Sequence, residues 1–247
     1  MRCYYDMHIH TALSPCGDND MTPNNIVGMA TICGLDVIAV TDHNTCGNCK
    51  AVMAVGEANG ITVLPGMELS TDEEVHMVCL FPTIEDALAF EEVVKPRIPP
   101  IKNRPDIFGE QRLLDEDDAI VGYESALLIN ATGVSIEEVL PLCRQHHGTA
   151  YPAHIDRDSY SILSSLGDIP PLGYTAAEIT ADGDVEKLKA SYSAIADVPL
   201  ILSSDAHYLH QIAEASAWLD LPECTPQAVI AALDGQIRCD WGRQKEG

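Results

Sequence analysis

The sequence is poor in basic residues. Only 14 of its 247 residues are lysine or arginine, against 38 aspartates and glutamates, which gives a formal net charge of −24. A surface this acidic repels a polyanion, which argues against binding of long nucleic acid except by its end at a local cationic or metal-rich patch. A small phosphorylated substrate fits the charge better.

Membrane-spanning and secretory segments are also missing. No apolar stretch approaches the roughly 18 residues of a membrane span, and no basic region followed by an apolar segment opens the sequence. We therefore expect a cytoplasmic protein with no membrane partner. A hydrophobic content of 46% can form a full core, and we expect one domain over residues 1–247. The oligomeric state is not predicted.

The cysteines do not form the pattern of a disulfide scaffold. They are nine, an odd number, and are scattered between Cys3 and Cys239, which favours reduced thiols. Cys46 and Cys49 form a CxxC pair, but no second pair accompanies it. Plain thiols near a helix start are therefore favoured over a redox pair or half of a zinc site.

Short apolar runs alternate with segments that carry helix start and stop signals. Pro23 after Thr22 is typical of a helix start, and Ser135 with Glu138 forms a capping box. The alternation predicts repeated β/α units. The predicted strands cover residues 3–8, 37–40, 61–64, 75–80, 149–153, 177–179 and 200–203.

The alternation is interrupted between residues 95 and 130. This interval contains four prolines and the acidic run 115–118, so we interpret it as an insertion or lid. We expect it to select the substrate, with Glu110, Gln111 and Arg112 as candidates to reach it.

Six of the nine histidines lie in short clusters with carboxylates or with each other. Imidazole and carboxylate are ligands that Zn, Mn and Fe accept. Most clusters directly follow a predicted strand, and His76, early in its strand, is the exception. Ligands from six of seven strands favour a closed barrel over an open doubly wound sheet, which would gather them at one point.

The spacing within the clusters supports a metal site. His8 and His10 point to the same face of an extended strand. Glu68 follows an apolar run, where a carboxylate is costly to bury without a cation, and its two oxygens suit a bridge between two ions. The other three histidines have structural interpretations, at the end of a helix or on the surface: His146, His147 and His210.

In their order along the chain, these motifs resemble those of the polymerase and histidinol phosphatase (PHP) family of metal-dependent phosphoesterases. The resemblance spans residues 8 to 207 and implies a distorted seven-stranded (β/α)7 barrel with two or three divalent ions (Mn, Zn or Fe). The motifs are His8-Ile9-His10, Thr41-Asp42-His43-Asn44, Glu68, His76, Pro152-Ala153-His154 and Ser204-Asp205-Ala206-His207.

The resemblance also implies how the ions share their ligands. One ion would take His8, His10, Glu68 and Asp205. A second would share Glu68 and take His76 and His154. A third would take His43, His207 and one residue of the loop after His10. That loop lacks the family's usual Ser-Asp-Gly, and its candidate ligand is Asp18, with Cys16 or Asp20 as alternatives.

Such a site implies hydrolysis of a phosphoester by a metal-activated water. Arg157 is the candidate phosphate clamp, because a guanidinium binds two oxygens at once, although a plain surface role fits it nearly as well. Asp42 and His207 are candidate catalytic residues that protonate the leaving group or orient ligands.

We therefore predict an enzyme, a phosphoesterase acting on a small phosphorylated metabolite, a nucleotide or an oligonucleotide terminus. Two alternatives stay open. The same activated water can attack a carbonyl, so a metal-dependent hydrolase of amide-type bonds is one of them. A metal-binding domain without turnover is the other.

Overall fold

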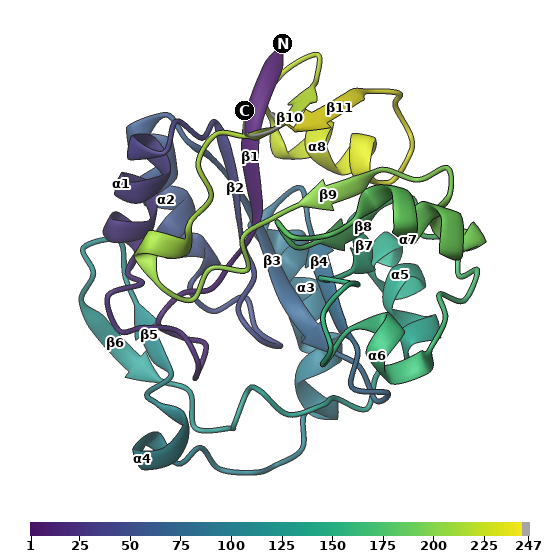
Figure 1. Cartoon of the computed structure of the whole chain (residues 1–247). Coiled ribbons are helices and arrows are strands. Elements are labelled where there is room, and N and C mark those ends of the chain that lie inside the picture. The colour runs from purple at the N-terminus through teal and green to yellow at the C-terminus, as the bar shows by residue number, and fades with distance from the viewer. Residues whose placement is uncertain (244–247) are drawn as a thin grey trace.

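The computed structural model describes residues 1–243 and contains a curled, mixed β-sheet with helices on its outer side (Figure 1). Five neighbouring strands run in the spatial order β1, β2, β3, β4, β7, and β8 and β9 form a separate parallel pair. Their bounds are β1 (Arg2–Ile9), β2 (Val37–Val40), β3 (Thr62–Ser70), β4 (His76–Leu80), β7 (Thr149–Pro152), β8 (Ala177–Ile179) and β9 (Leu200–Leu202).

Hydrogen bonds beyond the regular ladders connect these strands into a distorted barrel. Just after β7, the N–H of Ile155 donates to the carbonyl oxygen of Glu178 in β8 at 2.9 Å. Just after β9, Ala206 forms a parallel bridge with Ile9 of β1. All seven predicted strands are present, and the predicted barrel class is confirmed. Two strands that we did not predict, β10 (Ala217–Asp220) and β11 (Asp240–Arg243), extend the sheet beyond the first half of β1.

Strand β4 departs from the parallel β/α pattern expected from the sequence. It runs antiparallel to both of its neighbours, β3 and β7. The link of residues 71–75 between β3 and β4 is too short for the crossover that a parallel connection needs. The amino end of β4 therefore lies at the barrel edge where β1, β2 and β3 end, and this places His76 with residues that follow their strands.

Two helices begin where the sequence predicts, at Pro23 after Thr22 and at Ile136 after Ser135. Thr83 caps its helix by accepting a hydrogen bond from the N–H of Asp86, and Ser135 forms the predicted capping box with Glu138. No helix in the described part of the chain has the length and hydropathy needed to cross a membrane. The helices are α1 (Pro23–Ile32), α2 (Cys49–Asn59), α3 (Ile84–Val94), α4 (Pro105–Phe108), α5 (Ile136–Gln145), α6 (Ile162–Leu166), α7 (Val185–Ser191) and α8 (Pro226–Leu233), with 3-10 turns at Lys95–Arg97, Ser193–Ile195 and Leu209–Gln211.

Alternate residues of the strands build two apolar layers. In β2, Val37 and Ala39 belong to a cluster shared by strands all around the barrel, whereas Ile38 and Val40 pack among the helices. Helix α8 contributes Val229 to the first cluster and lies at the end of the barrel where β1 begins (Figure 1). The opposite end, where β1 finishes, is thus left for polar residues.

The segment from residue 95 to 130 lies at this opposite end and contains α4 and a small antiparallel ribbon, β5 (Arg112–Leu114) and β6 (Ile120–Tyr123) (Figure 1). Two asparagines tie it to the barrel. The Asn44 amide donates to the carbonyl oxygens of Leu128 and Asn130 at 2.7 and 2.9 Å, and Asn48 bonds the backbone of β5. The N–H of Arg112 also donates to the carbonyl oxygen of Ala12 at 2.9 Å, so the segment is attached directly to the loops that follow β1 and β2.

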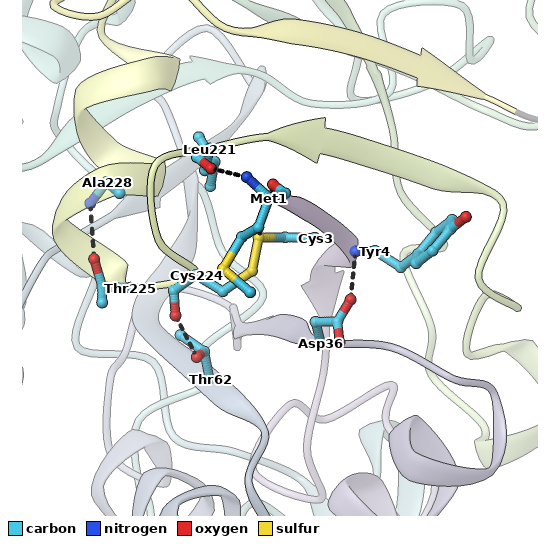
Figure 2. The surroundings of a disulfide bond; sticks show 9 residues. All are labelled: Met1, Cys3, Tyr4, Asp36, Thr62, Leu221, Cys224, Thr225 and Ala228. Carbon is cyan, nitrogen blue, oxygen red and sulfur yellow. Dashed lines mark hydrogen bonds between the residues drawn. A yellow bond between two sulfur atoms is a disulfide. The ribbon is translucent and has the colours of Figure 1, made fainter.

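A disulfide joins Cys3 of β1 to Cys224 ahead of α8, with Cα atoms 6.0 Å apart (Figure 2). The carbonyl oxygen of Cys224 also accepts a hydrogen bond from Thr62 Oγ1 at 2.8 Å. The expectation of reduced thiols is therefore wrong for these two cysteines, because residues 221 positions apart become neighbours only in the folded chain. Cys46 and Cys49 are buried free thiols at the start of α2, as predicted.

Reduction of this disulfide is expected to lower the free energy of unfolding by about 2–4 kcal/mol, because it releases a constraint on a very long loop of the unfolded chain. Thermal unfolding with and without dithiothreitol measures the effect. A Cys16→Ser variant should respond to the reductant like the wild type, and a C3S/C224S double variant should not. An unchanged Tm of the reduced wild type would contradict this expectation.

Candidate metal centre

The carboxylate of Glu68 is at the centre of a buried cluster of histidines. Its Oε1 lies 2.8 Å from His76 Nδ1, 3.0 Å from His154 Nε2 and 3.4 Å from His8 Nε2. Its Oε2 lies 3.0 Å from His43 Nδ1 and 3.3 Å from His10 Nε2. The two oxygens therefore face two different groups of imidazoles, as a bridging ligand would.

Asp205, which follows β9, is the second carboxylate of the cluster. Its Oδ1 lies 3.0 Å from His10 Nε2 and 3.3 Å from His8 Nε2. The four residues that we assigned to one ion offer ligand atoms that all lie within 4.8 Å of one another. These residues are His8, His10, Glu68 and Asp205.

Two further sets of possible ligands satisfy the same 4.8 Å limit, and each differs from the expected set by one residue. One set joins His43, in place of His154, to Glu68 and His76. The other joins His10, in place of Asp18, to His43 and His207. All six histidine and carboxylate ligands of the first two expected sets, together with His43, are thus in one cluster.

The loop after His10 does not bring a carboxylate into these sets. Asp18 Oδ1 accepts a hydrogen bond from the N–H of Asp20 at 2.8 Å, while the Asp18 N–H donates to the His207 carbonyl oxygen at 2.9 Å. Cys16 and Asp20 are exposed. Asp18 as a ligand of a third ion stays a prediction.

Opposite charges compensate one another inside the cluster. Burial favours the neutral form of a carboxyl group, yet the surrounding histidines hold the pKa of Glu68 and of Asp205 well below the usual range. Burial also lowers the pKa of a histidine, but the neighbouring carboxylates raise the pKa of His10 to about 9 and that of His8 well above its usual value. Without a metal, protonated imidazoles would therefore balance the carboxylates.

Two other histidines are neutral at neutral pH. Burial lowers the pKa of His43 well below its usual value. Burial and the positive charge of His10 lower the pKa of His207 to about 4. A neutral imidazole keeps a lone pair that can bind a metal.

Two buried nitrogens of the cluster have no hydrogen-bond partner among the residues that the structure describes: His76 Nε2 and His154 Nδ1. An unsatisfied buried polar atom costs about 1–3 kcal/mol. Imidazole and carboxylate are also the ligands that Zn, Mn and Fe accept. The residues present therefore fit divalent cations.

A buried network behind the cluster fixes the orientation of His10. Ser14 Oγ lies 2.8 Å from His10 Nδ1 and donates to Asp42 Oδ1 at 2.6 Å. Asp42 also accepts hydrogen bonds from the N–H and the hydroxyl of Thr11, both at 2.7 Å. Both oxygens of Asp42 are thus occupied, in a position from which it can orient a ligand.

Glu178 supports His8 in a similar way and was missed by the sequence analysis. Its buried Oε1 lies 2.9 Å from His8 Nδ1 and accepts a hydrogen bond from the N–H of His154 at 3.1 Å. A carboxylate behind a metal-binding histidine fixes the tautomer and the ring orientation. The available signal was a single glutamate within the apolar strand Ala177–Ile179, where an unpaired charge is costly.

The backbone is strained where two of the cluster residues leave their strands. His154 has a φ of 28° and Asp205 a φ of 51°, in the left-handed region that non-glycine residues rarely adopt. Each such residue costs about 1–3 kcal/mol and persists only where its surroundings hold it. Strain at two candidate ligands is typical of a functional site.

Arg157 lies at the edge of the cluster. Its Nη1 is 2.5 Å from Asp205 Oδ2, and its side chain is 42% exposed. The guanidinium is thus held next to a candidate ligand and still reaches solvent. Gln111 is instead buried, and its amide bonds three backbone groups within the 95–130 segment.

Comparison with known families identifies this arrangement. A family model described as the PHP domain matches residues 6–165. This chain belongs to the PHP family. Membership agrees with the predicted class of enzyme, a hydrolase acting on phosphoester bonds, and implies divalent metal ions.

Curated relatives match part of this PHP chain. An uncharacterised protein of Methanocaldococcus jannaschii is 32% identical over 99 residues, covering 36% of this chain and 58% of the relative. The 5'-3' exoribonuclease Rnm of Salmonella typhimurium is 33% identical over 95 residues, covering 34% of this chain and 31% of the enzyme. The matches thus span less than two thirds of either relative.

The fold of this PHP chain also occurs in endonuclease Q from Pyrococcus furiosus. The two structures share a TM-score of 0.68 and 17% sequence identity, over 98% of this chain and 58% of the endonuclease. At this identity the likeness concerns the fold alone. Another structure of endonuclease Q holds a 27-mer duplex with an abasic lesion at its active site.

The role assigned to Glu178 can be tested in the PHP chain by Glu178→Gln. We expect metal affinity to fall about 10- to 100-fold, because the amide cannot hold His8 as the carboxylate does. Calorimetric titration of Mn²⁺ into chelator-treated protein measures this. Glu186→Gln, an exposed glutamate of α7, is the matched control. Wild-type affinity in the Glu178→Gln variant would show that the contact plays no part in metal binding.

Proposed function

We propose that this chain is a metal-dependent phosphoesterase that acts on a small phosphorylated metabolite, a nucleotide or the terminus of an oligonucleotide. One observation carries the proposal: the two oxygens of the buried Glu68 lie within 3.4 Å of five histidine side chains. Such a concentration of ligands around one carboxylate is costly in a protein interior unless it holds cations.

The proposed ligands of two or three ions are the clustered side chains His8, His10, His43, Glu68, His76, His154, Asp205 and His207, with Asp18 as a further candidate. Divalent ions there would supply an activated water and neutralise the charge of a phosphoryl group. Mn, Zn and Fe all suit mixed imidazole and carboxylate ligands.

The other residues of the site would bind and orient. We propose that Arg157 contacts a phosphoryl oxygen, since its guanidinium is anchored at Asp205 and remains partly exposed. The bonds of Asp42 to Thr11 and Ser14 support a positioning role for it, through Ser14 to His10. These contacts favour orientation of ligands over proton transfer for Asp42.

The segment of residues 95–130 is proposed as an insertion that forms one wall of the site. The hydrogen bonds of Asn44 and Asn48 attach it next to His43, which supports this assignment. The net charge of −24 favours a small substrate or a chain end over a long nucleic acid. The exoribonuclease and endonuclease Q, which resemble this chain in part or in fold, make nucleotides the first substrates to examine.

Release of inorganic phosphate or of nucleotide tests the proposal. The chelator-treated protein is reloaded with Mn²⁺, Zn²⁺ or Fe²⁺ and given p-nitrophenyl phosphate, nucleoside monophosphates, sugar phosphates, a 5'-phosphorylated oligonucleotide and amide substrates. We expect metal-dependent hydrolysis of at least one. Hydrolysis only of amide substrates, or bound metal without any turnover, would overturn the proposal.

A further inference from the structure

A cavity of about 630 Å³ lies beside the metal centre, between the loops that follow β7 and β8. Arg157 and Thr180 line it and also line a smaller cavity of about 250 Å³, which reaches His154 and Asp205. The larger cavity, here called the acidic cavity, has a volume typical of a site for a small organic molecule. It meets the metal centre at Arg157, the proposed phosphate contact.

The charge of the acidic cavity is mainly negative. Four carboxylates line it, against two cations, Arg157 and Lys187. Nη1 of Arg157 is already paired with Asp205. The carboxylates are those of Asp156, Asp158, Asp182 and Asp184.

Two of these carboxylates have structural partners and two do not. Asp156 accepts hydrogen bonds from the N–H and hydroxyl of Thr180 at 2.9 and 2.6 Å, and Asp184 caps α7. Asp158 and Asp182 are exposed and have no hydrogen bond or ion pair with any residue in the range 1–243. They are therefore free to accept hydrogen bonds from a ligand.

A buried hydroxyl in the smaller cavity also lacks a partner. Ser203 is 6% exposed, and its Oγ has no hydrogen bond within the described part of the chain. Buried hydroxyls in proteins are almost always hydrogen-bonded. Ser203 lines the cavity together with His154 and Asp205, so a polar atom of a bound molecule is a suitable partner for it.

We propose that the acidic cavity receives the leaving group of the substrate, and that this group carries hydroxyl or amino groups, as a sugar or nucleoside does, but no second phosphate. The inference rests on the proposed function. Free carboxylates accept hydrogen bonds from hydroxyl and amino groups, whereas a second phosphate would meet like charge in a confined space. The cavity thus selects monophosphates over bisphosphates and over internal nucleotides of a chain.

The test compares 5'-AMP with adenosine 3',5'-bisphosphate, which differ by one phosphate. For the Mn²⁺-loaded protein we expect kcat/KM to be at least about tenfold higher for 5'-AMP, a difference of about 1.4 kcal/mol. In a D158N/D182N variant the preference should shrink about tenfold, because both free carboxylates are neutral. An E57Q/E92Q variant, which loses two exposed carboxylates on α2 and α3, should keep the wild-type preference.

Two outcomes overturn the inference: equal kcat/KM for the two nucleotides in the wild type, or a preference that D158N/D182N leaves unchanged. Calorimetric titration of both nucleotides into the chelator-treated protein, which lacks the metal needed for hydrolysis, tests it without turnover, and equal affinities would also overturn it. Failure to hydrolyse any phosphate substrate used to test the proposed function, despite tighter binding of 5'-AMP than of the bisphosphate, would overturn the proposed function and support the cavity assignment.

Discussion

Replacing Glu68 by glutamine is expected to lower metal-dependent phosphoester hydrolysis by at least about a thousandfold and to reduce the amount of bound metal. Glutamine has a similar shape but loses the negative charge and one of the two acceptor oxygens that face the histidines. In the metal-free protein, the protonated histidines that face Glu68 would then be buried without a counterion, which costs about 3–5 kcal/mol of stability. Steady-state kinetics and metal analysis of the purified variant measure both effects.

The matched control for this variant is Glu92→Gln, an exposed glutamate of α3. It makes the same chemical change away from the cluster and should keep wild-type activity and metal content. Circular dichroism of the Glu68→Gln variant separates loss of metal from loss of fold. A folded Glu68→Gln variant with full metal content and more than about a tenth of wild-type activity would exclude Glu68 as a central ligand.

Without bound metal, the protein is expected to lose stability as the pH rises from 6.5 to 9. The folded state raises the pKa of His10 from 6.5 to about 9 and therefore binds this proton more tightly than the unfolded chain. The resulting stabilisation is complete below pH 6.5 and is lost as the pH rises through about 9. The shift corresponds to about 3 kcal/mol. At the acid end the depressed pKa values of Glu68 and Asp205 act in the opposite sense, with stability lost as the pH falls.

With metal bound, the dependence on pH is expected to reverse over the same range. Metal and proton compete for the imidazole nitrogens, so binding strengthens as the histidines lose their protons. Urea unfolding at several pH values, in EDTA and in saturating Zn²⁺, measures both curves. His10→Gln should reduce the slope in EDTA and leave the part that comes from the raised pKa of His8, while His147→Gln, which changes an exposed histidine paired with Asp86, should keep the full slope. Parallel curves in EDTA and Zn²⁺ would contradict the assignment of the cluster as a metal site.

Local patterns were enough to predict much of this fold. The seven barrel strands are short apolar runs, and the capping residues Thr83 and Ser135 act within one turn of their helices. The predicted parallel direction of β4 was wrong, because the direction of this strand depends on the short link after β3 and not on the residues of β4 itself. Strands β10 and β11 were missed because they add to the sheet through pairing with the distant β1.

The candidate site likewise has residues that local motifs predicted and one residue, Glu178, that they did not. The histidines and carboxylates of the cluster were predicted from the sequence because their types, spacing and positions beside strands are written in short motifs. Glu178 was missed because no motif surrounds it, and its function comes from contacts with His8 and His154.

The amino-acid sequence by itself determined which side chains could bind a metal and that they would lie at strand ends, because both properties belong to a few neighbouring residues. The tertiary structure alone decided which histidines share Glu68, which cysteines are joined, and that an acidic cavity adjoins the centre. These depend on distances between segments that are far apart in the chain, and only the packing of the barrel sets such distances.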